Sequence, residues 1–215
     1  MITSAERFIE RVHHLLQAGY DTLTPSDIAR LNRKTEPDIT AGLAMRIQQL
    51  IDDRAVPGIT RAWSIVDNAP ENRPDLALAR QPPAKKRKLP DLKFRYGGQR
   101  QVLYFRFEAK KLSGTGDYKD LVSHQDGLGR FLRRVYGRHD TAGGLLGYVH
   151  TESPIVHAER VRAAIAAEPR KYRVDADGAW TAATWKHGPQ CCFRLSHSRK
   201  TSTPITIYYS FLLFA

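Results

Sequence analysis

The sequence predicts one α/β domain over residues 1–215, and three observations lead to this fold class. The chain of 215 residues is 41% hydrophobic, which suffices for one sizeable core. Its N-terminal part has apolar residues at helical spacing, whereas the middle contains short β-forming runs bounded by Pro, Gly and Asn. Helical and strand patterns then alternate, as they do where helices cover a sheet.

The N-terminal segment 1–55 is expected to be helical. Thr3 to Glu6 has a capping-box pattern, and the apolar stripe that follows is expected to end at Gly19. A short helix is expected after Thr24-Pro25, and a longer one from about Glu36 to Asp53. The stripe of the first helix consists of Ala5, Phe8, Ile9, Val12, Leu15 and Leu16, and that of the longer helix of Ile39, Leu43, Ile47, Leu50 and Ile51.

Residues 60–150 are expected to form the central core. Gly97-Gly98 is a turn signal between two β-forming runs, which are therefore expected to pair as an antiparallel hairpin. Residues 81–89, which include the basic run Lys85 to Lys88, are expected to form an exposed loop. The predicted strands of this part are 62–66, 76–79, 92–96 and 102–109.

The rest of the chain is expected to add one helix to the core and then complete the fold. A helix over 118–136 and a glycine-rich strand over 143–150 end the core. Within 151–215 we expect an alanine-rich helix over 155–168 and a final buried strand over 205–214.

Charge and compartment constrain the partners. The 34 Lys and Arg residues against 22 Asp and Glu give a net charge of +12 and a pI near 9.9, which favours nucleic acid. The N-terminus has no uninterrupted apolar stretch and the apolar C-terminal segment is short, so neither a signal peptide nor a membrane span is expected. Cys191 and Cys192 are adjacent and lack the spacing of a zinc site. We expect a cytoplasmic protein.

The pattern that carries chemistry is Pro90-Asp91 followed by Glu108-Ala109-Lys110. Side chains alternate along a strand, so Glu108 and Lys110 are expected on one face. A hairpin that turns at Gly97-Gly98 returns Asp91 to the neighbourhood of Glu108. Two carboxylates and an ammonium group are therefore expected to meet at one end of the sheet.

This combination suits phosphodiester hydrolysis. Carboxylate oxygens hold Mg²⁺, which polarises a phosphate and lowers the pKa of a bound water. A lysine beside them can orient that water and stabilise the negative charge that develops on the phosphate. The expected cofactor is Mg²⁺, with Mn²⁺ as an alternative.

The stretch from Asp91 to Lys110 resembles the motif of the PD-(D/E)XK nucleases, in which Pro-Asp begins one strand and Glu-x-Lys closes the next. The resemblance covers about residues 36–150. It implies a restriction endonuclease-like core, an α/β fold with a central mixed sheet flanked by helices, here with extra N-terminal helices. It also implies a divalent metal and cleavage of nucleic acid, with Asp91 and Glu108 as metal ligands and Lys110 as the catalytic lysine.

Two further positions compete for places in this site. Pro74-Asp75 opens an earlier strand, so Asp75 is an alternative to Asp91, which we prefer because its strand is hairpinned to Glu108. Many members of the family also place a glutamate on a helix before the sheet. Glu36 is the candidate, with Glu6 and Glu10 behind it, although an acid in a first helical turn is also favoured by the helix dipole alone.

The expected helix 118–136 carries candidate contacts to nucleic acid. Gln125 occupies a position at which some relatives carry a glutamine. Arg130, Arg134 and Arg138 recur every four residues, opposite Phe131 and Val135, which predicts a stripe that tracks phosphates or a solvated charged face.

The leading functional hypothesis is a Mg²⁺-dependent DNA endonuclease with a bacterial defence or restriction-type, antiviral role. The alternatives are a nucleic-acid-binding subunit without catalysis, within a multi-protein defence complex, and a ribonuclease. DNA is favoured over RNA, and a protein partner or a homodimer is compatible with the sequence.

Overall fold

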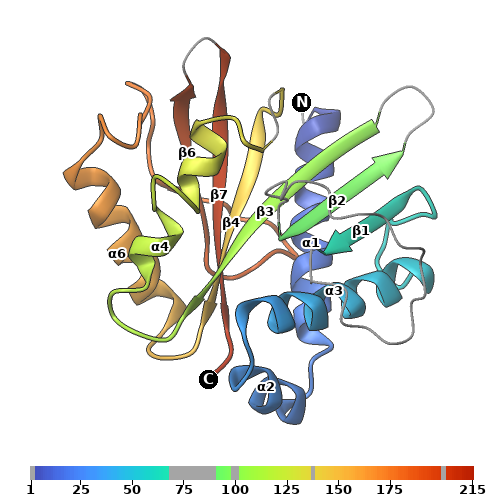
Figure 1. Cartoon of the computed structure of the whole chain (residues 1–215). Helices are drawn as coiled ribbons and strands as arrows, with labels where there is room; N and C mark the ends of the chain where they lie inside the picture. The colour runs from blue at the N-terminus through green and yellow to red at the C-terminus, as the bar shows by residue number, and fades with distance from the viewer. Residues whose placement is uncertain (1–2, 68–90, 98–101, 137–138, 200–201) are drawn as a thin grey trace, which may run out of the picture.

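The computed structural model describes residues 3–67, 91–97, 102–136, 139–199 and 202–215. Within them the protein is an α/β structure with a seven-stranded mixed sheet between helices (Figure 1). The predicted α/β class, with a central mixed sheet flanked by helices, is thus confirmed. The helices are α1 (Ser4–Asp21), α2 (Pro25–Asn32), α3 (Glu36–Asp52), α4 (Tyr118–Leu121), α5 (Leu128–Leu132) and α6 (Pro154–Ala167). The strands are β1 (Trp63–Asp67), β2 (Leu92–Gly97), β3 (Val102–Leu112), β4 (Ala142–Val149), β5 (Thr181–Ala182), β6 (Cys192–Arg199) and β7 (Ser202–Leu213).

The sheet has the strand order β1-β2-β3-β4-β7-β6-β5. β1, β2 and β3 form an antiparallel meander, and the expected hairpin is confirmed by the pairing of Leu92 with Phe107. β4 is parallel to β3 and to β7, while β6 and β5 continue the sheet antiparallel. Parallel neighbours need a crossover, and the chain between β3 and β4 supplies it through α4 and α5.

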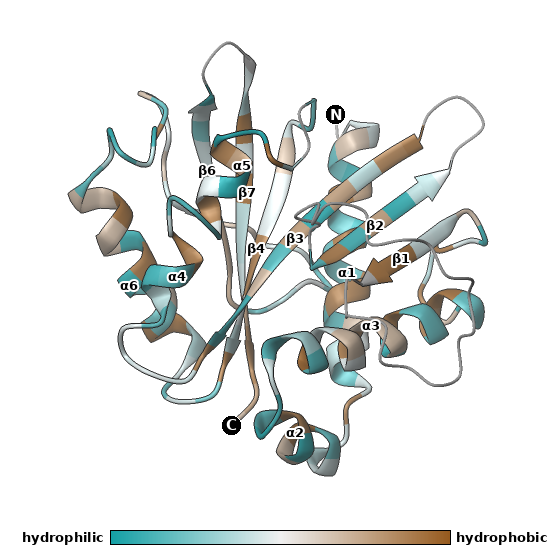
Figure 2. Cartoon of the chain, in the orientation of Figure 1, coloured by the Kyte–Doolittle hydropathy of each residue, from teal (hydrophilic) through white to brown (hydrophobic). Residues whose placement is uncertain are grey.

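Helices cover both faces of the sheet. Side chains alternate along β4, so Leu146 and Tyr148 join the core under α1 and α3, whereas Leu145 and Val149 join the core under α4, α5 and α6. α1 and α3 each combine hydrophobic and hydrophilic residues, as helices with one buried face do (Figure 2). The first core includes Phe94, which lies on the central hairpin.

The predicted N-terminal helices are present, with one correction. Thr3 and Glu6 form the expected capping box. Gly19, however, does not end the first helix, which continues to Asp21. A Cβ at Gly19 would lie 2.4 Å from Cγ1 of Ile47, so this glycine allows α1 to approach α3 closely.

The prediction of one continuous helix over 118–136 is wrong. The chain forms the short helices α4 and α5, with a bend between them. Gly127 has a positive φ of 51°, a backbone conformation that glycine adopts far more readily than other residues. Gly129 packs against the backbone of His124, which leaves no space for a side chain. Backbone geometry that only glycine tolerates thus interrupts the helical pattern.

The remaining predicted elements lie within three residues of the observed ones or outside the described residues. β4, α6 and β7 correspond to the strand 143–150, the helix 155–168 and the final strand 205–214. The expected strand 76–79 and the loop 81–89 lie outside the described residues. Among the described helices, none is both long and apolar enough to span a membrane.

Candidate active site

Asp91 is fixed to β3 by two hydrogen bonds. Its backbone N–H donates to the carbonyl oxygen of Phe107 over 3.0 Å, and its Oδ2 accepts from the backbone N–H of Ala109 over 2.7 Å. Because Leu92 pairs with Phe107, Asp91 lies across from Glu108. The predicted return of Asp91 to Glu108 is confirmed.

Glu108 and Lys110 lie on the same face of β3, as strand alternation predicts. The Lys110 ammonium Nζ is 3.1 Å from Oε1 of Glu108. The Glu108 side chain is fully buried, whereas that of Lys110 retains 16% exposure. A buried carboxylate therefore lies beside a cation that reaches the surface.

The second oxygen of Glu108 contacts a cation and a hydroxyl group from the crossover segment. Arg130 on α5 donates from Nη1 to Oε2 over 2.7 Å, and the Tyr136 hydroxyl donates to the same oxygen over 2.9 Å. Arg130 also forms an ion pair with Asp126 over 2.6 Å. The roles of Tyr136 and Asp126 were not predicted from the sequence. Only the spacing of Asp126 and Arg130, four residues apart, signalled their pairing.

Glu36 reaches the site from the first turn of α3. Its Oε1 is 3.3 Å from Nζ of Lys110, and its Oε2 accepts the backbone N–H of Lys111 over 3.2 Å. Thr40, one turn further along α3, contacts the buried hydroxyl of Tyr148 on β4 over 2.9 Å and so anchors this end of the helix to the sheet. Glu36 is thus brought together with the predicted motif.

The alternative glutamates on α1 lie elsewhere. Glu6 completes the capping box with Thr3, and Glu10 lines a groove beside Trp185. Of the three helical glutamates that the sequence offered, the structure brings only Glu36 to Lys110.

The charges at the site perturb one another. Burial, reinforced by the negative charge of Glu108, raises the pKa of Asp91 to about 7. For Lys110, burial alone would lower the pKa, but the attraction of Glu108, Glu36 and Asp91 outweighs it and raises the pKa. Lys110 is therefore held as a cation among three carboxylates.

The donor set fits a lightly bound Mg²⁺ better than an ion that needs a complete protein cage. Among the described residues no group of three or more His, Cys, Asp and Glu could hold a metal. Mg²⁺ commonly uses only one or two carboxylates and keeps several waters. Asp91 and Glu108 supply two. Burial and, after it, the negative charge of Glu108 raise the pKa of Asp91, and a divalent cation would relieve the repulsion between the two carboxylates.

The predicted nucleic-acid contacts do not form a stripe. Gln125 lies in the bend before α5, where its carbonyl accepts a hydrogen bond from Arg133 over 2.7 Å. Arg134 follows the end of α5 with a positive φ of 63°, and Arg130 points inward to Glu108. The regular spacing of these arginines is therefore broken by the backbone. Asp75 and Arg138 lie outside the described residues.

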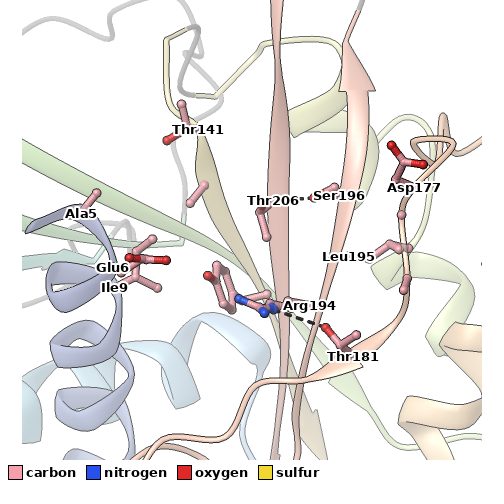
Figure 3. A pocket seen from close by; sticks show the side chains of 14 residues that line it. Ala5, Glu6, Ile9, Thr141, Asp177, Thr181, Arg194, Leu195, Ser196 and Thr206 are labelled. Atoms are coloured by element: carbon pink, nitrogen blue, oxygen red, sulfur yellow. Dashed lines mark hydrogen bonds between the residues drawn. The ribbon is translucent and has the colours of Figure 1, made fainter. Parts of the chain in front are cut away.

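A cavity of about 460 Å³ lies between α1 and the strands β6 and β7, and no residue of the carboxylate cluster lines it (Figure 3). In it Arg194 donates to the Thr181 hydroxyl over 3.3 Å, and Ser196 and Thr206 bond each other over 3.2 Å. Four of its polar side chains are thus paired with each other.

Comparisons with protein-family models, with curated proteins and with solved structures find no match to this chain.

Proposed function

We propose that this protein is a metal-dependent nuclease of the PD-(D/E)XK class that hydrolyses phosphodiester bonds, with DNA as the favoured substrate. The observation that carries the proposal is the convergence of Asp91, Glu108 and Lys110 at the β2–β3 hairpin, with Glu36 completing the cluster. A surface ion pair would need none of this burial or convergence.

The order of the elements supports the same reading. A helix, an antiparallel three-stranded meander and a crossover into a parallel strand follow one another as α3, β1–β3, α4–α5 and β4. This agrees with the restriction endonuclease-like core that the motif implies. The restriction-type, antiviral defence role and the cytoplasmic location belong to the same proposal.

Each side chain has a role in this mechanism. Asp91 and Glu108 would hold Mg²⁺ or Mn²⁺, which supplies a polarised phosphate and a more acidic water when bound. Lys110, held as a cation by Glu108 and Glu36, orients the attacking water and stabilises negative charge on the phosphate oxygens. Glu36 positions Lys110. The hydrogen bond from the N–H of Lys111 holds the Glu36 carboxylate against β3.

The test is cleavage of circular DNA, linear DNA and RNA in Mg²⁺, in Mn²⁺ or in EDTA. The wild-type protein should cut only with metal, and Asp91→Asn and Lys110→Met should not cut. Lys119→Met, on the exposed surface of α4, is the matched control and should cut normally. Circular dichroism and thermal unfolding establish that each variant is folded. If folded Asp91→Asn cuts as fast as wild type, the proposal is wrong.

A second candidate is a nucleic-acid-binding subunit without catalysis. It is favoured by one observation: both oxygens of Glu108 contact cations of the protein itself, Lys110 and Arg130. Binding that does not depend on metal, with no cleavage of any substrate, would support it. Cleavage of RNA alone would instead identify the protein as a ribonuclease.

A further inference from the structure

Beyond Glu108, which Arg130 of α5 contacts, one face of the antiparallel meander carries exposed side chains. Its other face, with Phe94, Phe105 and Phe107, packs in the core under α1 and α3. In Figure 1, α1 passes behind β2 and β3, and the open face points toward the viewer. We refer to the side chains on this side, Val66, Lys93, Arg95, Val102, Tyr104 and Arg106, as the meander face.

The meander face combines exposed hydrophobic groups with cations. Val66, Val102 and Tyr104 are 53%, 42% and 37% exposed. Val102 and Tyr104 are neighbours on one side of β3, whereas Val66 lies two strands away, opposite Lys93. Tyr104 is therefore an exposed aromatic ring on a surface that also carries Lys93, Arg95 and Arg106.

Tyr104 lies next to two cations. Nζ of Lys93 is 4.6 Å from the centre of the Tyr104 ring, and the guanidinium carbon of Arg106 is 5.2 Å from it. Arg106 is paired with Asp140. Lys93 and Arg95 have no acidic partner among the described residues, so two positive charges next to this ring remain available.

The meander face is continuous with the carboxylate cluster. Lys93 follows Asp91 by two residues and Arg106 precedes Glu108 by two, all on the same side of the hairpin. At about 3.3 Å per residue, Tyr104 lies roughly 13 Å along β3 from Glu108. A chain lying along β3 from Tyr104 would therefore reach the site within a few nucleotides.

We propose that the meander face binds single-stranded nucleic acid, with a base stacked on Tyr104 and backbone phosphates at Lys93 and Arg95. This inference rests on the proposed nuclease function and adds its substrate class and the path of the strand. An exposed ring flanked by cations is what proteins present to unpaired bases and their phosphates. In a duplex the bases already stack on one another, so the ring would have no free base face to contact. The excess of positive charge over the whole chain favours a polyanion over an acidic protein patch.

Binding is measured by fluorescence anisotropy in EDTA, so that no cleavage occurs, with a labelled poly-dT strand and a duplex of the same length. The single strand should bind more tightly than the duplex. Tyr104→Ala should weaken binding of the strand about 5- to 150-fold, the range expected for loss of one stacked base, and Tyr104→Phe should retain it. Val135→Ala, at an exposed hydrophobic residue outside the meander face, should leave binding unchanged.

The salt dependence tests the cations separately. Lys93→Gln should reduce the slope of log K against log salt by about 0.7 for a single strand. Arg170→Gln, an exposed arginine after α6, is the matched control and should leave the slope unchanged.

The outcomes separate this inference from the proposed activity. If the wild-type protein and Asp91→Asn bind the strand equally and Tyr104→Ala does not, the meander face is confirmed, whether or not the wild type cuts. Equal binding of strand and duplex, or full binding by Tyr104→Ala, overturns the inference even if cleavage is found. It is also overturned if Tyr104→Ala converts a dimer to monomers in sedimentation while strand binding is unchanged, since the face would then bind a second copy.

Discussion

Arg130 donates a hydrogen bond from Nη1 to Oε2 of Glu108 over 2.7 Å, although the two residues belong to different elements, α5 and β3. This pair ties the crossover segment to the only carboxylate of the cluster that is fully buried. Arg130 therefore stabilises the charge of Glu108 from the side opposite Lys110.

Removal of this arginine is expected to destabilise the fold. Arg130→Ala leaves a buried carboxylate with one fewer counterion, which costs about 3 kcal/mol. Arg162→Ala, which breaks an exposed pair with Glu159 on α6, should cost less than about 1 kcal/mol. Urea unfolding of both variants makes the comparison. Equal losses would mean that the Glu108 pair contributes no more than a surface contact.

The hydroxyl of Tyr136 is expected to contribute separately. Tyr136→Phe removes its bond to Oε2 of Glu108 and should lower the free energy of unfolding by about 2 kcal/mol. Tyr104→Phe removes a hydroxyl from a ring that is 37% exposed and should have almost no effect. Chemical denaturation measures both. An unchanged unfolding midpoint for Tyr136→Phe would show that the bond is not formed in solution.

Glu36 is expected to affect cleavage without affecting binding. Glu36→Gln keeps an acceptor for the N–H of Lys111 but removes the charge that faces Lys110, so cleavage should slow about 10- to 100-fold. Glu10→Gln on α1 should cut normally. The measurement is the single-turnover rate, together with binding in EDTA. A drop in binding equal to the drop in rate would contradict a role in positioning Lys110.

Gly129 is expected to be essential for the geometry of the crossover. A Cβ there would lie 1.8 Å from the carbonyl oxygen of His124, a backbone atom that cannot move aside cheaply. Gly129→Ala should therefore cost about 3 kcal/mol or more and displace the neighbouring Arg130. Gly116→Ala meets no atom within 4 Å and should be neutral. Thermal unfolding of the two variants measures the loss of stability, and equal midpoints would contradict the prediction.

Stability should fall in mild acid because of buried histidines. Burial among aromatic rings lowers the pKa of His13 from 6.5 to about 4, against a smaller opposing effect of its bond to the Ile9 carbonyl. The folded protein keeps the ring neutral, while the unfolded chain binds a proton below its ordinary pKa. The stabilisation is therefore complete above pH 6.5 and is lost as the pH falls toward 4.

The size of this effect is at most about 3 kcal/mol for His13. The urea midpoint should fall between neutral pH and pH 4 by less in His13→Leu than in wild type. His139→Leu, at an exposed residue, should follow the wild-type curve. Identical pH dependence of the urea midpoint in all three proteins would exclude His13 as a source of the stability lost in acid.

The central hairpin could be predicted because strand alternation and hairpin pairing depend only on residues that are close in the sequence. Strand alternation fixes the shared face of Glu108 and Lys110, and antiparallel pairing returns Asp91 to them. These conclusions need only the strands and the turn signal between them.

The surroundings of Glu108 could not be predicted in the same way. Helical periodicity between residues 118 and 136 suggested a continuous helix, but the positive φ of Gly127 and the close packing of Gly129 depend on tertiary structure. Once the helix is interrupted, Arg130 turns inward. Likewise, Glu36 and Lys110 are 74 residues apart, and their contact depends on how Thr40 and Tyr148 dock α3 on the sheet.

The two bonds that join Asp91 to β3 have a consequence for how this protein can vary. The position of the carboxylate is fixed by Phe107 and Ala109 on the neighbouring strand. It therefore depends on the register between β2 and β3, in which Leu92 pairs with Phe107. A substitution that slipped this pairing by one residue would turn the side chains of β2 to the opposite face of the sheet and separate Asp91 from Glu108.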